Sequence, residues 1–404
     1  MSANAPGADV VVVGGGVIGL AVAWRARLLG LSVALLERDT IGERGASGVA
    51  AGMLAPVSEV EFGTAGRCVL ELGVRSAALW PEFAAELELA SSIDVGLRSS
   101  GTLVLARDAD EARELERQIA FREELGLRVR RLLPSAARAL EPALAPTVRL
   151  ALEAPDDHSV SPRRVLSALR LVCGRAGVQL REHAAAARVD VERGRVAGVT
   201  LADGSRVRAA RVVLAAGAWS GEVEGLPAAA RVPVRPLKGQ ILRLRDPAGA
   251  GLLERVLRFE GGYLVPRGDG RYVLGATVEE RGFERRPTAG GVYELLRDAR
   301  ELVPGVLELH IEELSVGFRP ATPDNVPAIG ASSLPGLLWA TGHQRNGILL
   351  APVTAGLLAA LLADSAGASE EDRALLAACS PARFAAGRSD AAAQRTRSPL
   401  EILT

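Results

Sequence analysis

Apolar and polar positions along the first forty residues follow the order strand, turn, helix, strand. ADVVVV at residues 8–13 is apolar enough for a buried strand, and GGGVIG at 14–19 is a glycine turn. LAVAWRARLLG at 20–30 has helical spacing, and LSVALLE at 31–37 has the pattern of a second strand. This succession predicts a βαβ unit at the N-terminal end of the chain.

Later segments predict a second sheet and an exposed helix. Charges recur at helical spacing in 109–125, which is typical of an amphipathic helix in contact with solvent. Short strands with glycine turns occupy 188–216 and end in the buried run VVLAAG, which is expected to return to the first sheet. Strands in 231–278 favour a largely antiparallel sheet. A final apolar helix is expected to begin near Ile348, with Asn346 as its N-cap.

Composition narrows the class of partner. The chain has 404 residues, enough for two domains, and its 48 basic side chains balance its 48 acidic ones. No basic excess is present to recruit nucleic acid or an anionic membrane, and no uncharged apolar run reaches the roughly 18–20 residues of a membrane span. The short polar leader and three cysteines without metal-ligand or CxxC spacing favour a soluble cytoplasmic protein with no disulfide and no metal. A small molecule is the expected partner.

Three glycines of the first turn suit a dinucleotide. Gly14, Gly16 and Gly19 allow a tight turn, close approach of the backbone to a pyrophosphate, and close packing of helix on strand. The phosphate charge then lies at a helix N-terminus. Glu37 follows Gly19 by 18 residues, at the end of the next strand, where a carboxylate can bind ribose hydroxyls. The glycine motif alone is weak, but in this context it predicts dinucleotide binding.

The choice between FAD and a nicotinamide cofactor depends on the rest of the chain, because both share this motif. Arg38, directly after Glu37, is compatible with NADP. Against this, the small residues SGVAAGM at 47–53 suit a backbone that lies flat against a phosphate chain and a flavin ring. Gly217 in AAGAWS would pass beside the adenosine half of a long cofactor, although an ordinary strand-to-loop turn is the alternative. Free N–H groups before the final helix would stabilise the negative charge of a reduced flavin. Together these features favour FAD.

Six segments in order resemble one family. GGGVIG, LLERD, SGVAAGML, GGYLVPRGDGRYVLGAT, VGFRPATPDNVPAIG and ATGHQRNGILLAP are similar to the D-amino-acid oxidase superfamily and, within it, to the glycine oxidases of thiamin thiazole biosynthesis. The resemblance covers roughly residues 8–365. It implies an α/β fold: a Rossmann-type FAD-binding domain with an inserted, mainly antiparallel substrate-binding domain.

The resemblance also implies where the domains lie. Residues 1–80, 145–225 and 322–365 are expected to form the discontinuous FAD-binding domain. Residues 81–144 and 226–321 are expected to form the substrate-binding domain, and 366–404 a partly disordered tail.

FAD contacts are implied along most of the chain, with an adenine contact near Arg188. His343 is expected to approach the flavin through its backbone instead of acting as a base. Lys238, the only lysine, is expected to pair with local acids, although oxygen activation is the alternative. The implied contacts are Gly14, Gly16, Val17, Ile18, Gly19, Glu37, Arg38, Ala46, Ser47, Ala51, Gly52, Met53, Arg188, Gly217, His343, Gln344, Arg345, Asn346, Gly347, Ile348 and Leu349.

The substrate carboxylate is implied to bind Arg319 of the GFRP motif, with help from Tyr263 and Arg345. A guanidinium can meet a carboxylate through two parallel hydrogen bonds. The alternatives are a surface arginine, a core tyrosine and, for Arg345, support of the flavin turn. Met53 is expected to close the space beside the substrate's α-carbon. The glycines at 261–262, where bulkier residues can occur, leave the pocket size open.

The implied reaction is the oxidative deamination of glycine and small amines such as sarcosine to glyoxylate, ammonia and hydrogen peroxide, with O2 as acceptor. A hydride leaves the α-carbon of the neutral amine for flavin N5, so positioning does most of the catalysis. The resemblance also implies that the imine is supplied to thiazole formation, which makes thiazole synthase an expected partner. A homo-oligomer is expected. Two alternatives stay open: a sarcosine, proline or D-amino-acid oxidase or dehydrogenase of the same superfamily, and an inactive flavoprotein scaffold for thiazole synthase.

Overall fold

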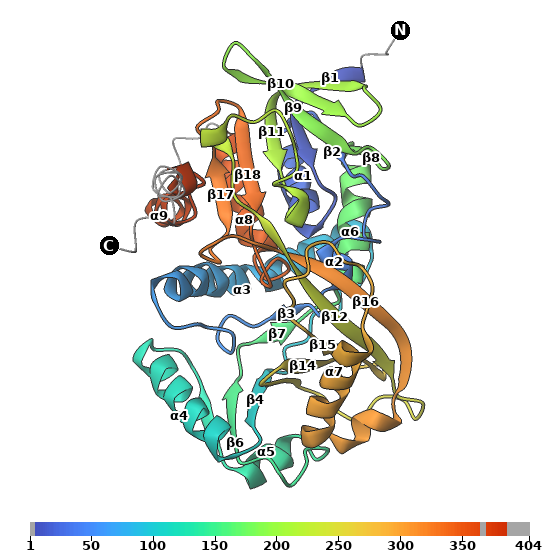
Figure 1. Cartoon of the computed structure of the whole chain (residues 1–404), viewed down its shortest axis with the longest axis vertical. Coiled ribbons are helices and arrows are strands. Elements are labelled where there is room, and N and C mark those ends of the chain that lie inside the picture. The colour runs from blue at the N-terminus through green and yellow to red at the C-terminus, as the bar shows by residue number, and fades with distance from the viewer. Residues whose placement is uncertain (1–4, 364–368, 386–404) are drawn as a thin grey trace, which may run out of the picture.

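The computed structural model describes residues 5–363 and 369–385, which form two large sheets (Figure 1). Five neighbouring strands of the first sheet, β18, β11, β1, β2 and β8, are parallel. Parallel strands are covered on both faces, which explains the unbroken apolar run at the start of the chain. In spatial order the strands are β17 (Ala328–Ala331), β18 (Leu337–Thr341), β11 (Arg206–Leu214), β1 (Ala5–Val13), β2 (Val33–Leu36) and β8 (Gln179–Arg181), with the hairpin β9 (Ala186–Glu192) and β10 (Arg195–Leu201) added to β11.

Helices cover one face of the first sheet. Val10 and Val12 point into the core beneath these helices, while the alternate residues Val11 and Val13 belong to a second core on the opposite face. The predicted βαβ unit is confirmed as β1, α1 and β2. The covering helices are α1 (Val17–Leu28), α3 (Thr64–Ser91), α6 (Pro162–Arg175) and α8 (Ala351–Leu362).

The second sheet is mainly antiparallel, as predicted, with a single parallel pair between β4 and β13. The predicted amphipathic helix is α4 (Ala109–Glu124), which begins after Asp108. The strands are, in spatial order, β16 (His310–Ala321), β12 (Arg235–Arg245), β15 (Arg271–Gly275), β14 (Gly262–Pro266), β13 (Val256–Phe259), β4 (Thr102–Ala106), β6 (Leu150–Ala154) and β5 (Arg130–Leu132), accompanied by α4, α5 (Pro134–Leu140) and α7 (Ala289–Leu302).

Two elements extend across the expected domain boundaries. Helix α3 continues past residue 80 to residue 91 and packs on α6 and α8 of the first domain. Strand β6 lies beyond residue 144, yet it pairs with β4 in the second sheet. The chain therefore returns to the first domain after β6 and not at 145. The run LALEA in β6 is apolar enough for either sheet, so its pattern alone does not assign it.

The C-terminal part differs from expectation in two ways. Helix α8 begins at Ala351 with Leu350 as its N-cap, and not near Ile348. The preceding turn is closed by the N–H of Leu350, which donates to the backbone oxygen of Asn346, so Asn346 is not the N-cap. Within the expected tail, α9 (Glu370–Ala378) is an ordered helix that contacts α3. Residues 366–368 and 386–404 of that tail lie outside the described residues.

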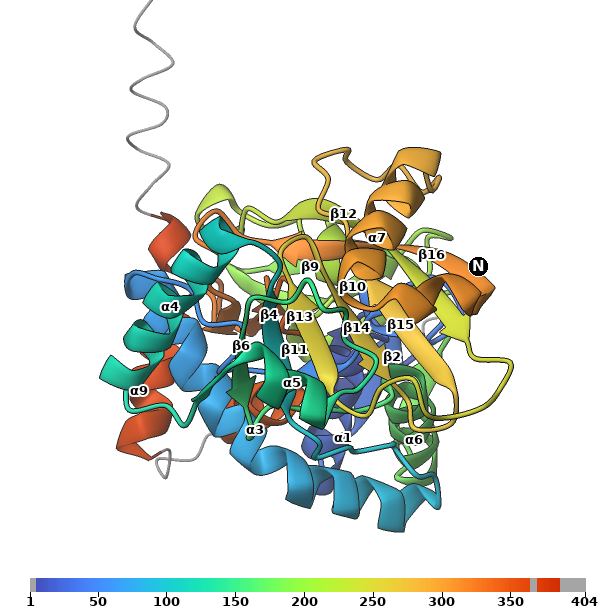
Figure 2. The ribbon, with the colours of Figure 1, turned by 90° about the horizontal axis from the view of Figure 1, so that it is seen from below.

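The long strands β12 and β16 of the second sheet pair along most of their length (Figure 2). The shorter elements are α2 (Ala46–Val49), β3 (Met53–Leu54), β7 (His158–Ser159) and the 3₁₀ turns η1 (Gly217–Trp219), η2 (Ala228–Ala230) and η3 (Pro304–Glu308). Of the helices described, none combines the length and apolar character required to cross a membrane. Likewise, the described His, Cys, Asp and Glu side chains form no cluster suited to a metal ion.

Candidate cofactor and substrate site

A cavity of about 760 Å³ lies between the two sheets. This volume falls in the upper part of the range of about 300–1,000 Å³ found for ligand sites. Its lining contains every site residue expected from the sequence except Gly19, Arg188, Asn346 and Leu349. Segments that are far apart in the sequence, from the glycine turn to Ile348, therefore line one cavity.

The glycine turn is built as its spacing predicts. Gly14 has φ +110°, and a Cβ there would lie 2.4 Å from the backbone oxygen of Ala215. A Cβ at Gly19 would lie 1.9 Å from the oxygen of Gly14, so helix α1 can pack on the turn only without a side chain. At Gly16 the nearest atom would be Ser47 Oγ at 3.3 Å, and Gly16 borders the cavity. Gly14 and Gly19 serve the fold, whereas Gly16 keeps the backbone accessible to a ligand phosphate.

The acidic residue after β2 lines the cavity and also fixes the turn. Glu37 Oε2 accepts a hydrogen bond from the N–H of Gly15 at 2.7 Å, and its Oε1 accepts one from the N–H of Asp39 at 3.0 Å. Arg38 pairs with Asp39 at 3.1 Å, and its guanidinium lies 3.7 Å from the ring centroid of Trp219. Arg38 is therefore engaged within the protein, which weakens the argument for a 2′-phosphate of NADP.

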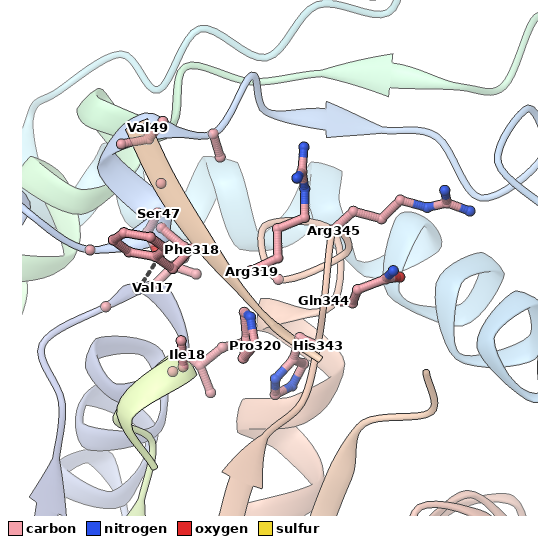
Figure 3. A pocket seen from close by; sticks show the side chains of 18 of the residues that line it. Val17, Ile18, Ser47, Val49, Phe318, Arg319, Pro320, His343, Gln344 and Arg345 are labelled. Carbon is pink, nitrogen blue, oxygen red and sulfur yellow. Dashed lines mark hydrogen bonds between the residues drawn. The ribbon is translucent and has the colours of Figure 1, made fainter. Parts of the chain in front are cut away.

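The small-residue run faces the cavity as a tightly packed backbone. Ser47 Oγ accepts a hydrogen bond from the N–H of Val17 at 3.1 Å, which ties this run to the glycine turn (Figure 3). A Cβ at Gly48 would lie 2.3 Å from the oxygen of Gly42. Gly52 has φ +80°, and a Cβ there would lie 2.2 Å from the oxygen of Val160. These contacts explain why small residues occupy the segment.

Four expected cofactor residues lie outside the lining. Gly19 is buried under the turn, and Asn346 and Leu349 border a small neighbouring pocket. Arg188 instead pairs with Asp190 at 3.2 Å, and its side chain is largely exposed. The alanines at 185–187 line the cavity in its place. The structure therefore places residues 185–187, and not the Arg188 side chain, beside the cavity.

Arg319 is a partly buried cation at the second-sheet end of the cavity, on β16. Its Nη1 donates to the backbone oxygen of Thr277 at 3.0 Å, and in the part of the chain that the structure describes it has no carboxylate partner. A Cβ at Gly239, on the paired strand β12, would lie only 2.5 Å from Nη1. Gly239 therefore creates the space that the guanidinium occupies, a role that the sequence patterns did not indicate.

Tyr263 lies on β14 and lines the same end of the cavity. Its hydroxyl has no hydrogen-bond partner among the described residues, and burial raises the pKa of Tyr263, so the phenol is a neutral donor. The two glycines before Tyr263 are required by the fold. Gly261 has φ +85°, and a Cβ there would lie 2.9 Å from Asp298 Oδ2. At Gly262 a Cβ would lie 2.8 Å from the oxygen of Gly275.

The side chain of Arg345 extends away from that of Arg319 (Figure 3). Its Nε lies 3.5 Å from Glu59 Oε2, and its Nη2 pairs with Glu61. Glu59 also pairs with Arg258 at 3.4 Å, and both line the cavity. This arrangement favours the alternative that Arg345 supports the turn before α8. Glu59 and Arg258 lie far apart in the sequence and in no recognised motif, so only the fold reveals their pairing.

His343 and Lys238 are occupied with structural contacts. His343 Nε2 lies 3.0 Å from Thr354 Oγ1, and burial lowers the pKa of His343 to about 3, so the ring is neutral. Lys238 Nζ donates to the backbone oxygen of Arg286 at 2.8 Å and lies 3.3 Å from Glu279. Lys238 is not among the cavity lining, although its neighbours on β12 are, which agrees with pairing to local acids.

Comparison with known proteins decides the family. A family model described as FAD dependent oxidoreductase (DAO) matches residues 9–361. The chain belongs to this family. FAD is accordingly the cofactor of this FAD-dependent oxidoreductase, and the glycine turn, Glu37 and the small-residue run form a cradle that suits it.

Relatives and solved structures narrow the resemblance. The chain is 36% identical to a glycine oxidase of Geobacillus kaustophilus, over 88% of this chain and 92% of that protein. It is 37% identical to the Bifunctional protein ThiO/ThiG of Nostoc sp., over 88% of this chain and 53% of that protein, so it spans about half the length of the bifunctional relative. A crystal structure of glycine oxidase from Geobacillus kaustophilus superposes with a TM-score of 0.85 at 34% identity, covering 92% of this chain and 98% of that chain.

Proposed function

We propose that this FAD-dependent oxidoreductase oxidises glycine and similarly small amines with O2, giving glyoxylate, ammonia and hydrogen peroxide. One observation carries the proposal: Arg319 presents a guanidinium without a carboxylate partner in the described chain, in the same cavity as the glycine turn. A fixed cation suits a substrate carboxylate. The similarity to glycine oxidases over most of both chains supports glycine as the substrate.

The residues of the cavity act by binding and orientation. Bound FAD would supply the acceptor for the hydride, which carries two electrons away from the amine carbon. Arg319 and the phenol of Tyr263 hold the carboxylate, which fixes the α-carbon relative to the cofactor. His343 is neutral and bonded to Thr354, so it is not available as a base. Positioning, and not proton abstraction by a side chain, is the proposed source of rate enhancement.

The proposal includes partners and location. The imine would pass to thiazole formation, with thiazole synthase as partner, and this is supported by a bifunctional relative about half of whose length lies beyond the matched region. We also propose a cytoplasmic homo-oligomer; a reducing compartment suits the free thiols of Cys68, Cys173 and Cys379. The mass of the protein in solution, alone and mixed with thiazole synthase, tests these points.

The proposed function is tested by the visible spectrum of the FAD-loaded protein before and after addition of glycine without oxygen. The expected result is loss of the oxidised flavin absorbance, its return when air is admitted, and one hydrogen peroxide formed per glyoxylate. A flavin that glycine leaves oxidised would overturn the proposal. If D-proline or a bulky D-amino acid reduces it instead, the related oxidase is correct, and if no amine does, the scaffold alternative is correct.

Substrate size tests the role of Met53, which lines the cavity on β3. Glycine and sarcosine should have the highest kcat/KM, D-alanine a much lower value, and L-amino acids none, because added groups must displace packed atoms. Met53→Gly should raise activity on larger D-amino acids and leave glycine turnover within a modest factor. A peroxide-coupled assay measures this, and an unchanged preference in Met53→Gly would remove Met53 from the pocket wall.

A further inference from the structure

Three arginines contact the small-residue run through its backbone carbonyl groups. Arg267 Nη2 donates to the oxygen of Ala51 at 2.6 Å, and Arg243 Nη2 donates to the oxygen of Gly48 at 2.9 Å. Arg163 Nε also donates to Gly48, at 3.0 Å. None of the three arginines lines the cavity, whereas residues 49–53 do. The run therefore separates these guanidinium groups, which we term the arginine clamp, from the cavity.

The clamp carries more positive charge than its acidic partner neutralises. Glu313 lies 2.7 Å from Arg163 and 3.7 Å from Arg243. Arg267, which ends the GGYLVPR motif, forms no ion pair with any carboxylate in the described ranges. Burial lowers the pKa of Arg267 to about 9 and that of Arg243 to about 10, so both remain cationic at neutral pH.

Arg267 also determines the direction of one peptide group. It donates through Nη2 to the oxygen of Ala51 and through Nη1 to the oxygen of Val160 at 2.8 Å. In a planar trans peptide the N–H points opposite to the C=O, so the N–H of Gly52 points away from Arg267. Gly52 lines the cavity, and its N–H has no acceptor among the described residues, while its own oxygen accepts from Val160 at 2.9 Å. This N–H is free to donate to a ligand.

We propose that Arg267 is a positioning residue for the flavin: it holds the Ala51 carbonyl so that the N–H of Gly52 donates to the bound ring, and its unpaired charge makes this wall electropositive. Fixed donors and positive charge stabilise the negative charge that a flavin gains on reduction. Arg267 thereby makes the flavin easier to reduce. The inference rests on FAD binding and not on the identity of the amine.

The test is the midpoint potential of the bound FAD in the whole protein, measured by equilibration with a reference dye in the absence of any amine. Arg267→Met removes the charge and both donated hydrogen bonds. Arg267→Lys keeps the charge but cannot span both carbonyl oxygens. Arg271→Met is the matched control, because Arg271 belongs to the same hairpin, pairs with Asp269 and does not contact the small-residue run. FAD affinity, from fluorescence quenching, and glycine turnover are measured in parallel.

Arg267→Met should shift the potential to more negative values and lower kcat by about tenfold or more, as expected when a preorganised donor is lost. KM for glycine should change less than kcat, because Arg319 is untouched. Arg267→Lys should shift the potential in the same direction by less, and Arg271→Met should not shift it. A wild-type potential in Arg267→Met overturns the proposal. If that variant does not retain FAD, a wild-type potential in Arg267→Lys overturns it instead. A failed glycine assay with a shifted potential would count against the substrate and not against Arg267.

Discussion

The proposed function depends on Arg319, whose guanidinium has no acidic partner among the described residues. Arg319 donates a hydrogen bond to the oxygen of Thr277, and its strand β16 is paired with β12. The guanidinium is therefore fixed in place before any ligand arrives. A charge held in this way gives a carboxylate a bound geometry without further ordering of the protein. Binding of the substrate should therefore depend far more on Arg319 than on Arg345, which is already paired with Glu59 and Glu61.

Arg319→Ala should reduce kcat/KM for glycine by the equivalent of about 3–5 kcal/mol, because a buried charge pair is broken. Tyr263→Phe should cost about 1–2 kcal/mol, the value of one hydrogen bond. Arg345→Ala should cost less than Arg319→Ala. Steady-state kinetics at several glycine concentrations measure all three, and unchanged kinetics in Arg319→Ala would remove the carboxylate assignment.

Gly239 allows an indirect test of the same cation. A methyl group at this position would lie 2.5 Å from Arg319 Nη1, so Gly239→Ala should displace the guanidinium without removing it. KM for glycine should rise by about tenfold or more, equivalent to at least about 1.4 kcal/mol, while FAD content stays normal. Gly290→Ala is the control, because a methyl group there would meet open space. Equal KM values in the two variants would contradict this role.

At the scale of elements, the βαβ unit holds its glycine turn in shape through hydrogen bonds to Glu37. The turn, the start of α1 and the carboxylate of Glu37 are joined by hydrogen bonds from the N–H of Gly15 and Asp39. These contacts are local in sequence, so the spacing of the glycines and the acid was sufficient to predict the unit. The clamp and the pair between Glu59 and Arg258 were not predictable, because their members come from a helix, strands and loops that are far apart in the sequence and meet only in the folded chain.

Substitutions in the βαβ unit should lower FAD occupancy. Gly16→Val would place a side chain where the backbone faces the cavity, and Glu37→Ala would leave two backbone donors without an acceptor, at a cost of about 1–3 kcal/mol each. The ratio of flavin to protein absorbance after purification measures this. Gly174→Ala, on the surface of α6 with no atom near the added methyl group, should retain full FAD. Yellow protein with full occupancy from Gly16→Val would contradict the cradle.

At the scale of the whole molecule, burial of His343 links stability to pH. Its folded pKa of about 3 lies below its ordinary value near 6.5, so the unfolded chain binds the proton more readily. The full contribution is present above pH 6.5 and is lost as pH falls, by about 1.4 kcal/mol per pH unit. Between pH 7.5 and 5.5, His343→Gln should lose about 1.4 kcal/mol less stability than wild type. Urea unfolding at saturating FAD measures the free energy of unfolding of both proteins at both pH values. Equal losses of stability in His343→Gln and wild type would contradict the burial of His343.

The overall architecture was predicted more accurately than the positions of the domain boundaries. The sequence predicted a βαβ unit in the first sheet and a second, mainly antiparallel sheet, and both are present, although β9, β10 and β17 add antiparallel pairs to the first sheet. The expected domain boundaries at residues 80 and 144 differ from the structure. Helix α3 continues through residue 80, and the apolar strand β6, which suits either sheet, pairs with β4 in the second sheet. The order of strands in a sheet depends on long-range pairing, which local patterns do not record.

The paired strands β12 and β16 have a mechanical consequence. Arg235 pairs with Ala321 at one end and Arg245 with His310 at the other, so a long two-stranded ribbon of the second sheet carries Arg319. Because both strands belong to the second sheet, this ladder holds Arg319 within that sheet and does not bridge to the first. A rotation of one sheet relative to the other should therefore carry Arg319 along with the second sheet and change its distance from the glycine turn.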